Sequence, residues 1–352
     1  MNKTNINLLS LTRKEFRNVL VEKDYKGFRG EQIFNWIYKN GVISPEKMIN
    51  LPGDLQKKVK EEFSFPKLKI NKRLTSTDGT IKYLFETNDG ENVESVYLPE
   101  YEENRHTICV SSQIGCSVGC KFCATGLTGY SRDLRADEII AQILQIQKDI
   151  SSNNFGIPRI SNIVFMGMGE PLYLLDTILK VIDILNEPKG FNIARRKFTI
   201  STSGIVPGIR RLTSSDKQVG LAVSLNAPDD ELRNELMPIN KKYPVKNLLV
   251  AVEEYTEVTG RRVTFEYILI SKINDTINCA KKLGKLLQNI NCHINLIAVN
   301  PVPECGFERP NRRRINKFKN ILSKKLSVTI RKERGSDIDA ACGQLRKREG
   351  GI

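Results

Sequence analysis

The sequence predicts an α/β fold in which an open, partial barrel of six strand–helix units follows a helical domain. From about residue 107, short β-rich runs alternate with helix-length amphipathic segments, which is typical of a parallel sheet with helical crossovers. The six runs are fewer than the eight strands that close a full barrel, so we expect one side to stay open. A doubly wound open sheet is the alternative that the same pattern allows.

The first hundred residues divide into a helical part and a hairpin. Residues 1–75 should form a compact helical accessory domain, because apolar residues such as Ile33, Trp36 and Ile37 recur at a spacing of three to four. Residues 76–105 alternate and turn at Asp89–Gly90, a pair that favours a tight β-hairpin. We expect this hairpin to link the helical domain to the barrel.

The barrel should span residues 106–301, and an extension should occupy residues 302–352. Between the first two runs, Ala136–Ile150 carries isoleucines on one helical face, and Ile277–Ile290 repeats that pattern between the last two. Segments of this length can cross from one parallel strand to the next. The six predicted strands are Thr107–Val110, Ile163–Met166, Phe198–Ser201, Leu221–Leu225, Val263–Ile270 and Ile294–Val299.

The chain carries a formal net charge of +15, with 55 Lys and Arg against 40 Asp and Glu. This balance favours a polyanionic partner such as a nucleic acid, and a generally basic surface that serves solubility is the alternative. The basic residues are dispersed along the sequence, which indicates a folded surface patch rather than a disordered arm. The clusters are Arg195–Lys197, Lys241–Lys242, Arg312–Arg314, Lys324–Lys325 and Arg346–Arg348.

The composition is that of an ordinary globular protein, with 40% hydrophobic and 27% charged residues. The N-terminus lacks an apolar signal core and no stretch is long enough to cross a membrane, so we expect a cytoplasmic, monomeric protein without a membrane partner. Its eight cysteines are then better interpreted as thiols, ligands or catalysts than as a disulfide framework. With only two histidines, His106 and His293, a zinc site of three histidines is excluded.

Glycines and small polar residues follow five of the six predicted strands. In parallel α/β folds, ligands bind at the carboxyl ends of the strands, so these segments should line one polar pocket. Loops favour Gly and Ser in any case, so a single such segment is weak evidence. The prediction depends on finding them after most of the predicted strands. The segments are Ser111–Gln113, Gly167–Pro171, Ser201–Gly204, Ser224–Asn226 and Asn300–Pro301.

Three cysteines in one short stretch, Cys116, Cys120 and Cys123, have the spacing C-x3-C-x2-C. Three thiolates can hold an iron–sulfur cluster that normally takes four, which leaves one iron open to a small molecule. Phe122, beside the last cysteine, supplies the apolar shielding that suits a cluster. The alternative is a structural zinc with Cys109 as its fourth ligand, although C-x6-C is wide for a zinc knuckle.

This cysteine spacing after the first strand resembles the signature of radical S-adenosylmethionine (SAM) enzymes, which implies a partial barrel of the radical SAM type. From about residue 26 to residue 345 the chain more closely resembles one family of them, the dual-specificity RNA methyltransferases of the RlmN type. Two positions depart from that family: Asn226 stands where a histidine is usual, and Tyr173–Leu174 stand where an asparagine often follows. The motifs that carry the resemblance are Cys109–Cys116, Met166–Leu172, Ser201–Pro207, Leu236–Asn240 and Asp337–Leu345.

The resemblance implies two cofactors, a [4Fe-4S] cluster held by Cys116, Cys120 and Cys123, and SAM, used twice per turnover. Asparagine at position 226 keeps hydrogen-bonding capacity but lacks a titratable ring, so an acid/base role there is not expected. The residues that match the SAM contacts of the family are Gly169, Glu170, Ser201, Ser224, Leu225, Asn226 and Asn300.

The resemblance also implies the chemistry. Cys342 matches a cysteine that carries a methyl group, and a radical made from the second SAM takes a hydrogen from that methyl, so that the carbon adds to C2 of adenine. Glu94 matches the proton acceptor that removes the C2 proton. Cys109 matches the thiol that forms a transient disulfide with Cys342 and releases the base. Basic neighbours such as Arg331 are expected to lower the pKa of Cys342.

The implied substrates are an adenine of 23S rRNA at the peptidyl-transferase centre and the adenine next to the anticodon in some tRNAs, with flavodoxin or ferredoxin as electron donor. The helical accessory domain of residues 1–75 is then expected to bind RNA. The first alternative is the related Cfr type, which methylates C8 of 23S rRNA adenine and confers antibiotic resistance. Pro171 and Ser203 favour the C2 enzyme, because the C8 type typically has Ala and Ile there. A more distant alternative is a non-catalytic RNA-binding protein with a structural zinc.

Overall fold

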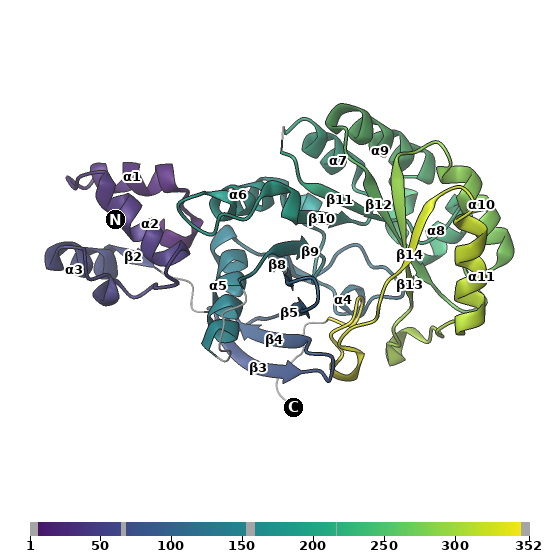
Figure 1. Ribbon diagram of the computed structural model, residues 1–352, viewed down its shortest axis with the longest axis horizontal. Helices are drawn as coiled ribbons and strands as arrows, with labels where there is room; N and C mark the ends of the chain where they lie inside the picture. The colour runs from purple at the N-terminus through teal and green to yellow at the C-terminus, as the bar shows by residue number, and fades with distance from the viewer. Residues whose placement is uncertain (1–5, 65–67, 153–158, 216, 346–352) are drawn as a thin grey trace.

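The computed structural model describes residues 6–64, 68–152, 159–215 and 217–345. A helical domain lies at one end of the long axis, and a large curved sheet with helices outside it fills the rest of the molecule (Figure 1). The predicted α/β architecture with an N-terminal helical part is therefore confirmed. The basic cluster Arg346–Arg348 lies outside the described residues. None of the described helices is long and apolar enough to cross a membrane.

The helical domain consists of α1 (Arg13–Val21), α2 (Phe28–Tyr38), α3 (Gly53–Glu62) and the short parallel pair β1 (Ile6–Asn7) and β2 (Phe63–Ser64). Helix α1 begins at a capping box, in which Thr12 and Glu15 each accept a hydrogen bond from the other's backbone N–H. Phe16 and Phe34 then pack edge to face between α1 and α2, with ring centroids 5.7 Å apart. Local capping and apolar spacing thus account for this domain.

Seven parallel strands form the barrel half of the large sheet. In spatial order they are β6 (Arg105–Cys109), β9 (Asn162–Phe165), β10 (Phe198–Thr202), β11 (Gly220–Ser224), β12 (Val263–Leu269), β13 (Cys292–Ala298) and β14 (Ser327–Ile330). The first six are the predicted strands, in their sequence order. The predicted six units fall one strand short, because β14 comes from the C-terminal extension. Its side chains are mostly exposed at the sheet edge, so its sequence lacks the apolar run that marks the others.

The other half of the sheet is antiparallel and brings it to ten strands. It consists of β5 (Asn92–Glu100) beside β6, then β4 (Ile81–Glu86) and β3 (Lys69–Thr75). The hairpin that turns at Asp89–Gly90 is confirmed. However, β3 falls within residues 1–75, which were expected to be helical. Residues 76–105 continue the large sheet and do not form a separate link between the helical domain and the barrel. The polar sequence of β3 conceals it, because β3 lies at the exposed edge of the sheet.

Helices cover the outer face of the curved parallel strands (Figure 1). They are α5 (Ala136–Ser152), α6 (Leu175–Asn186), α7 (Val206–Thr213), α8 (Asp230–Leu236), α9 (Val245–Thr259), α10 (Ile277–Leu287) and α11 (Arg312–Leu322). A doubly wound sheet would carry helices on both faces, so the partial barrel is the observed form. A small sheet of β7 (Gln113–Gly115) and β8 (Tyr130–Asp133), with the short α4 (Ala124–Leu127), was not expected and frames the cysteine loop.

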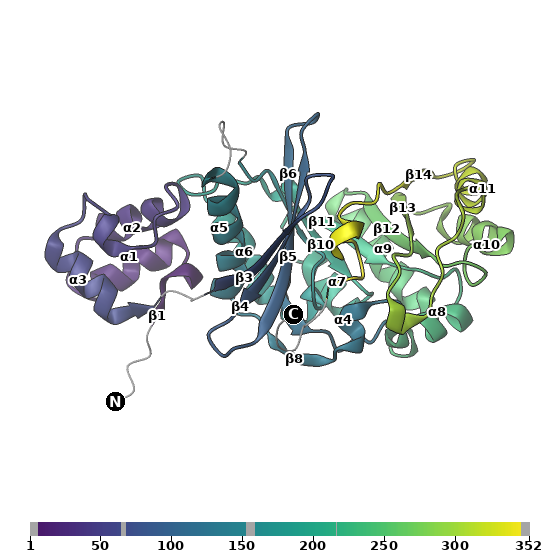
Figure 2. The same ribbon diagram turned by 90° about the horizontal axis from the view of Figure 1, so that it is seen from below.

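The segment after β14 runs back across the antiparallel strands. In Figure 2 these strands stand between the helical domain and the barrel, with the C-terminal segment beside them. Asp337 accepts a hydrogen bond from the Ser76 hydroxyl at 2.6 Å, and the carbonyl of Asp339 accepts one from the Lys82 ammonium at 2.9 Å. These contacts place the residues around Cys342 over the carboxyl ends of the barrel strands.

Candidate active site

The carboxyl ends of the parallel strands open into a pocket, which we call the cysteine-loop pocket. It holds about 870 Å³ of empty space, part of which is open solvent. The sequence-predicted residues that line it are Cys116, Cys120, Cys123, Gly169, Glu170, Ser201 and Ser224. Residues from four strand ends thus meet at one place, as the recurrence of polar strand ends predicted.

The cysteine loop is held by backbone hydrogen bonds. Gly115 has a positive φ of 75°, and a Cβ there would lie 1.7 Å from the carbonyl oxygen of Gly129, so only glycine fits the start of the loop. Cys116 N–H then donates to that same carbonyl at 2.9 Å, and Lys121 N–H donates to the carbonyl of Leu236 in α8 at 3.0 Å. Both β8 and α8 therefore shape the loop.

The three thiols of this loop fit an iron–sulfur cluster. Burial raises the pKa of Cys116 to about 12, and burial together with the neighbouring thiols of Cys123 and Cys116 raises the pKa of Cys120. The positive charge of bound iron would offset the cost of burying three neighbouring thiolates, because metal coordination deprotonates thiols. Among the described residues, no three His, Cys, Asp or Glu side chains surround a single metal-ion position. A cluster does not require that convergence, because each cysteine binds a different iron.

Glu170 is a buried carboxylate at the wall of the same pocket. One of its oxygens accepts hydrogen bonds from the backbone N–H and the hydroxyl of Ser203, each at 2.7 Å. Burial raises the pKa of Glu170, and these bonds oppose that shift. Gly169 before it has a φ of +99°, and a Cβ there would lie 2.5 Å from the Cβ of Gln113. The sharp turn presents a fixed anionic group to the pocket, which suits the ammonium group of an amino acid.

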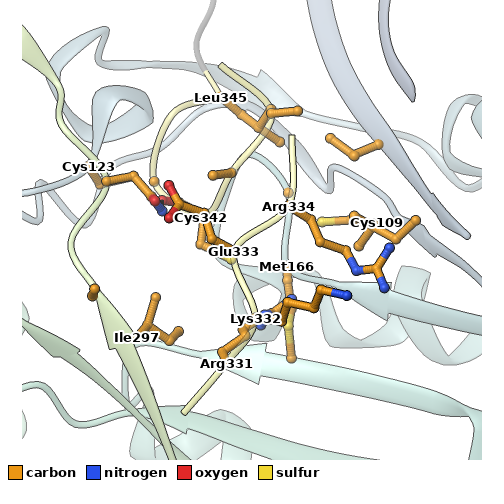
Figure 3. Close-up of a pocket in the computed structure, with 18 of the residues that line it drawn as sticks. Cys109, Cys123, Met166, Ile297, Arg331, Lys332, Glu333, Arg334, Cys342 and Leu345 are labelled. Atoms are coloured by element: carbon orange, nitrogen blue, oxygen red, sulfur yellow. Dashed lines mark hydrogen bonds between the residues drawn. The ribbon is translucent and has the colours of Figure 1, made fainter. Parts of the chain in front are cut away.

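A second pocket, which we call the paired-thiol pocket, adjoins the first. Cys109 on β6 and Cys342 of the C-terminal segment both line it, and Cys123, Arg331 and Cys342 line both pockets (Figure 3). Burial first, and then the neighbouring thiol of Cys342, raise the pKa of Cys109 to about 12 against the opposing charge of Arg331. Cys109 and Cys342 therefore lie close enough to influence each other electrostatically. This location weakens the zinc alternative, which requires Cys109 beside the other three cysteines.

The loop that carries Cys342 is fastened from both sides. Asn300, just after β13, donates from Nδ2 to the carbonyl oxygen of Cys342 at 3.0 Å. On the opposite side, Ala124 N–H, next to Cys123 in the cysteine loop, donates to the carbonyl of Gly343 at 2.8 Å. The loop with Cys342 is thus tied directly to the loop with the predicted cluster ligands.

Three sequence-predicted residues do not line either pocket. Glu94 on β5 lies 3.4 Å from the ammonium of buried Lys82 and lines a separate small cavity. Asn226 has a φ of +59°, which asparagine tolerates better than most residues, and its Oδ1 accepts from the N–H of Ile268 at 2.9 Å. Leu225 is buried, and its carbonyl accepts from Arg233. The side chain of Asn226 therefore serves the junction between β11 and β12.

Sequence reasoning missed Glu266 as a pocket residue. This buried carboxylate on β12 lines the cysteine-loop pocket and accepts a hydrogen bond from Asn295 Nδ2 at 2.9 Å. A signal was available, because a carboxylate inside the apolar run Val263–Leu269 requires a special environment. Lys82 had no such signal, since an alternating hairpin strand carries lysines routinely.

Two family models match the chain. Residues 110–278 match the model described as the radical SAM superfamily. Residues 6–64 match the model of the ribosomal RNA large subunit methyltransferase N-terminal domain. The first match covers the cysteine loop and the parallel strands from β9 to β12, and the second covers the helical domain.

Full-length relatives are also similar. The chain is 48% identical over 341 residues to a protein of Dictyoglomus thermophilum named "Probable dual-specificity RNA methyltransferase RlmN", with 97% of this chain and 96% of that protein covered. It is 46% identical over 343 residues to the protein of that name from Geobacillus kaustophilus, with 97% and 93% covered. A crystal structure of a radical SAM methyltransferase from Sphaerobacter thermophilus superimposes with a TM-score of 0.92 at 42% identity, covering 97% of this chain and 99% of that one.

Proposed function

The chain belongs to the RlmN family of dual-specificity RNA methyltransferases, and from that premise we propose that it methylates C2 of a specific adenine in 23S rRNA and the adenine next to the anticodon in some tRNAs. One observation carries the proposal: Cys109 and Cys342 share a pocket that continues into the pocket of the cysteine loop. Methyl transfer through a protein-bound carbon requires two separate thiol sites. One holds the cluster, and the other carries the methyl group and releases the product. The RNA would provide the polyanion that the net charge of +15 favours.

As a radical SAM enzyme, the protein uses a [4Fe-4S] cluster and SAM. Cys116, Cys120 and Cys123 would hold the cluster, and the Glu170 carboxylate would hold the amino group of SAM. When bound, this pair supplies a carbon radical by one-electron cleavage of SAM. The walls of the cysteine-loop pocket, which include Ser201 and Ser224, would hold the nucleoside part of SAM in place and exclude water.

Cys342 is the proposed methyl carrier and Cys109 the thiol that releases the product, with two SAM molecules consumed per turnover. After the Cys342-bound carbon has joined C2, Cys109 as a thiolate attacks the sulfur of Cys342. A disulfide forms as the bond between that sulfur and the carbon on C2 breaks. The electron pair of the broken bond stays with that carbon, which takes up a proton to become the methyl group, and the unpaired electron left by the radical addition returns to the electron donor. Cys109 is well placed for this attack, because it faces the same pocket as Cys342.

Glu94 is the proposed acceptor of the C2 proton. Val96 and Leu98, two and four residues further along the same face of β5, line the paired-thiol pocket, so Glu94 lies on the strand next to that pocket although it does not line it. The nearby ammonium of Lys82 favours the carboxylate form that a base needs. The adenine must leave its stack to reach this wall, as in other enzymes that modify bases.

RNA would be held mainly through phosphate contacts. Arg309, Lys332 and Arg334 line the paired-thiol pocket, so basic side chains flank the path of an incoming nucleotide. Binding should weaken steeply with salt. A flavodoxin or ferredoxin would supply electrons, and the protein would act as a monomer in the cytoplasm.

Methylation at C8 is the second candidate, since that enzyme type shares the cluster and both thiols. Ser203 favours C2, because the C8 type typically has isoleucine at this position, and an isoleucine side chain could not donate to Glu170 as the Ser203 hydroxyl does. Mapping the methyl group by mass spectrometry on rRNA and tRNA treated with the reconstituted enzyme tests the choice. We expect 2-methyladenine on both RNAs, whereas 8-methyladenine as sole product would contradict the proposal.

A further inference from the structure

Arg233 in α8 is a completely buried arginine, and within the described part of the chain its guanidinium donates hydrogen bonds only to neutral oxygens. Nη2 donates to the carbonyl of Ser203 at 2.5 Å and to that of Ser224 at 3.2 Å. Nε donates to the carbonyl of Leu225 at 3.0 Å, and Nη1 donates to the side-chain oxygen of Asn240 at 2.9 Å. The side chain thus joins the ends of β10 and β11 beneath the cysteine-loop pocket.

A buried cation surrounded by neutral acceptors requires a negative charge nearby. Burial lowers the pKa of Arg233 to about 10, and the two groups that oppose this shift are the Cys120 thiol, first, and the Asp230 carboxylate. Asp230 does not accept a hydrogen bond from Arg233 directly. Asn240 lies between the two side chains and donates to an Asp230 oxygen at 2.8 Å. Burying a charge without a compensating partner is strongly unfavourable. The cysteine loop is the neighbour that can provide the missing negative charge.

The backbone places Arg233 against that loop. Lys121 N–H, beside Cys120, donates to the carbonyl of Leu236, less than one helical turn from Arg233 on α8. Ser203 and Ser224, the residues whose carbonyls Arg233 holds, line the same pocket as Cys120. The guanidinium therefore lies behind the pocket wall, on the side of the second cysteine.

We propose that Arg233 is a positioning residue whose buried positive charge stabilises the reduced iron–sulfur cluster and raises its reduction potential. One-electron reduction by the donor adds one negative charge to the cluster and its three thiolates. A fixed cation in a low-dielectric surrounding favours that added charge. The inference rests on a cluster at Cys116, Cys120 and Cys123, and it does not depend on which RNA is methylated.

The test is an anaerobic redox titration of the reconstituted enzyme without RNA, followed by visible absorption and electron paramagnetic resonance. Arg233→Met should make the cluster at least tenfold harder to reduce at a fixed potential, which corresponds to a shift of about 59 mV to more negative values for one electron. Arg233→Lys retains the charge and should keep most of the potential. Arg210→Met is the matched control: Arg210 pairs with Glu254 on the surface, and its loss should leave the potential unchanged.

A variant that leaves Arg233 in place distinguishes the effect of its positive charge from the effect of losing its hydrogen bonds. Asp230→Asn removes the opposing carboxylate but keeps an oxygen to accept from Val245 N–H and Asn240, so it should shift the potential to more positive values. If Arg233→Met does not fold, Asp230→Asn decides the question. A wild-type potential in folded, iron-loaded Arg233→Met, or in Asp230→Asn, would overturn the proposal, whatever methylated base the enzyme produces.

Discussion

The side-chain amide of Asn300 donates a hydrogen bond to the backbone carbonyl of Cys342, with 3.0 Å between Nδ2 and the oxygen. This bond fastens the C-terminal loop to the end of β13, so the barrel itself positions Cys342, the proposed methyl carrier. The family resemblance assigns Asn300 to SAM binding. In the described chain its amide serves the Cys342 loop.

Asn300→Ala should therefore reduce methylation more than SAM cleavage. Loss of one hydrogen bond of about 1 kcal/mol frees the loop without removing a wall of the cysteine-loop pocket, so we expect roughly a fivefold loss of methylation. Parallel assays of methyl transfer and of reductive SAM cleavage measure this split. Gln344→Ala, which removes a second tether to the Pro301 carbonyl, should act in the same direction. Loss of SAM affinity in Asn300→Ala alone would instead identify a cofactor contact.

Cys342→Ala should abolish RNA methylation and leave reductive SAM cleavage largely intact. The substitution removes the proposed methyl carrier, whereas the three proposed cluster ligands and Glu170 stay in place. Formation of 5′-deoxyadenosine, measured by chromatography, reports the cleavage. Cys292→Ala, a change at a buried cysteine on β13 outside both pockets, serves as the control and should methylate normally. Complete loss of cleavage in Cys342→Ala would argue against the carrier role.

Cys109→Ala should trap a covalent protein–RNA adduct. Without the attacking thiolate, the bond between the Cys342 sulfur and the RNA-bound carbon cannot break. Denaturing electrophoresis with labelled RNA should reveal a slow band, and the double variant Cys109→Ala/Cys342→Ala should show none. Normal turnover by Cys109→Ala would exclude it as the resolving thiol.

Release of the adduct should accelerate with rising pH. Burial raises the pKa of Cys109 to about 12, so near neutrality only a small fraction is the thiolate that attacks. That fraction grows about tenfold per pH unit below the pKa, and the single-turnover release rate should follow it between about pH 7 and 9. SAM cleavage measured at the same pH values is the control. A release rate that does not change with pH would show that another step limits release.

Lys82→Met should destabilise the protein strongly. Lys82 and Glu94 form an ion pair at 3.4 Å with both side chains almost fully buried, and removing the ammonium deprives the buried carboxylate of that counter-charge. We expect a loss of roughly 3 kcal/mol in the free energy of unfolding, measured by urea denaturation. The double variant Lys82→Met/Glu94→Gln should recover part of that loss. If the double variant is no more stable than Lys82→Met, the Glu94 charge is not what destabilises it.

Local patterns in the sequence account for most of the fold. Apolar runs separated by amphipathic segments predict the six neighbouring parallel strands β6, β9, β10, β11, β12 and β13. Burial of one strand or one helix face depends on residues close in sequence, which is why this pattern is informative. The cysteine loop and the polar strand ends are predictable for a related reason: parallel strands bring their carboxyl ends to one edge. The exposed edge strands β3 and β14 escape prediction, because little of their surface is buried and their sequences need no apolar pattern.

The sequence by itself thus determined most of the architecture and predicted the candidate cluster ligands and thiols, while the tertiary structure decided which of these side chains meet. Cys109 and Cys342 lie at opposite ends of the barrel sequence and share a pocket only because the segment after β14 folds back over the strand ends. The inward location of Arg233 and the use of Asn226 within the β11–β12 junction also follow from long-range packing. Periodicity encodes which face of an element is buried, but sheet register and curvature decide which buried groups become neighbours.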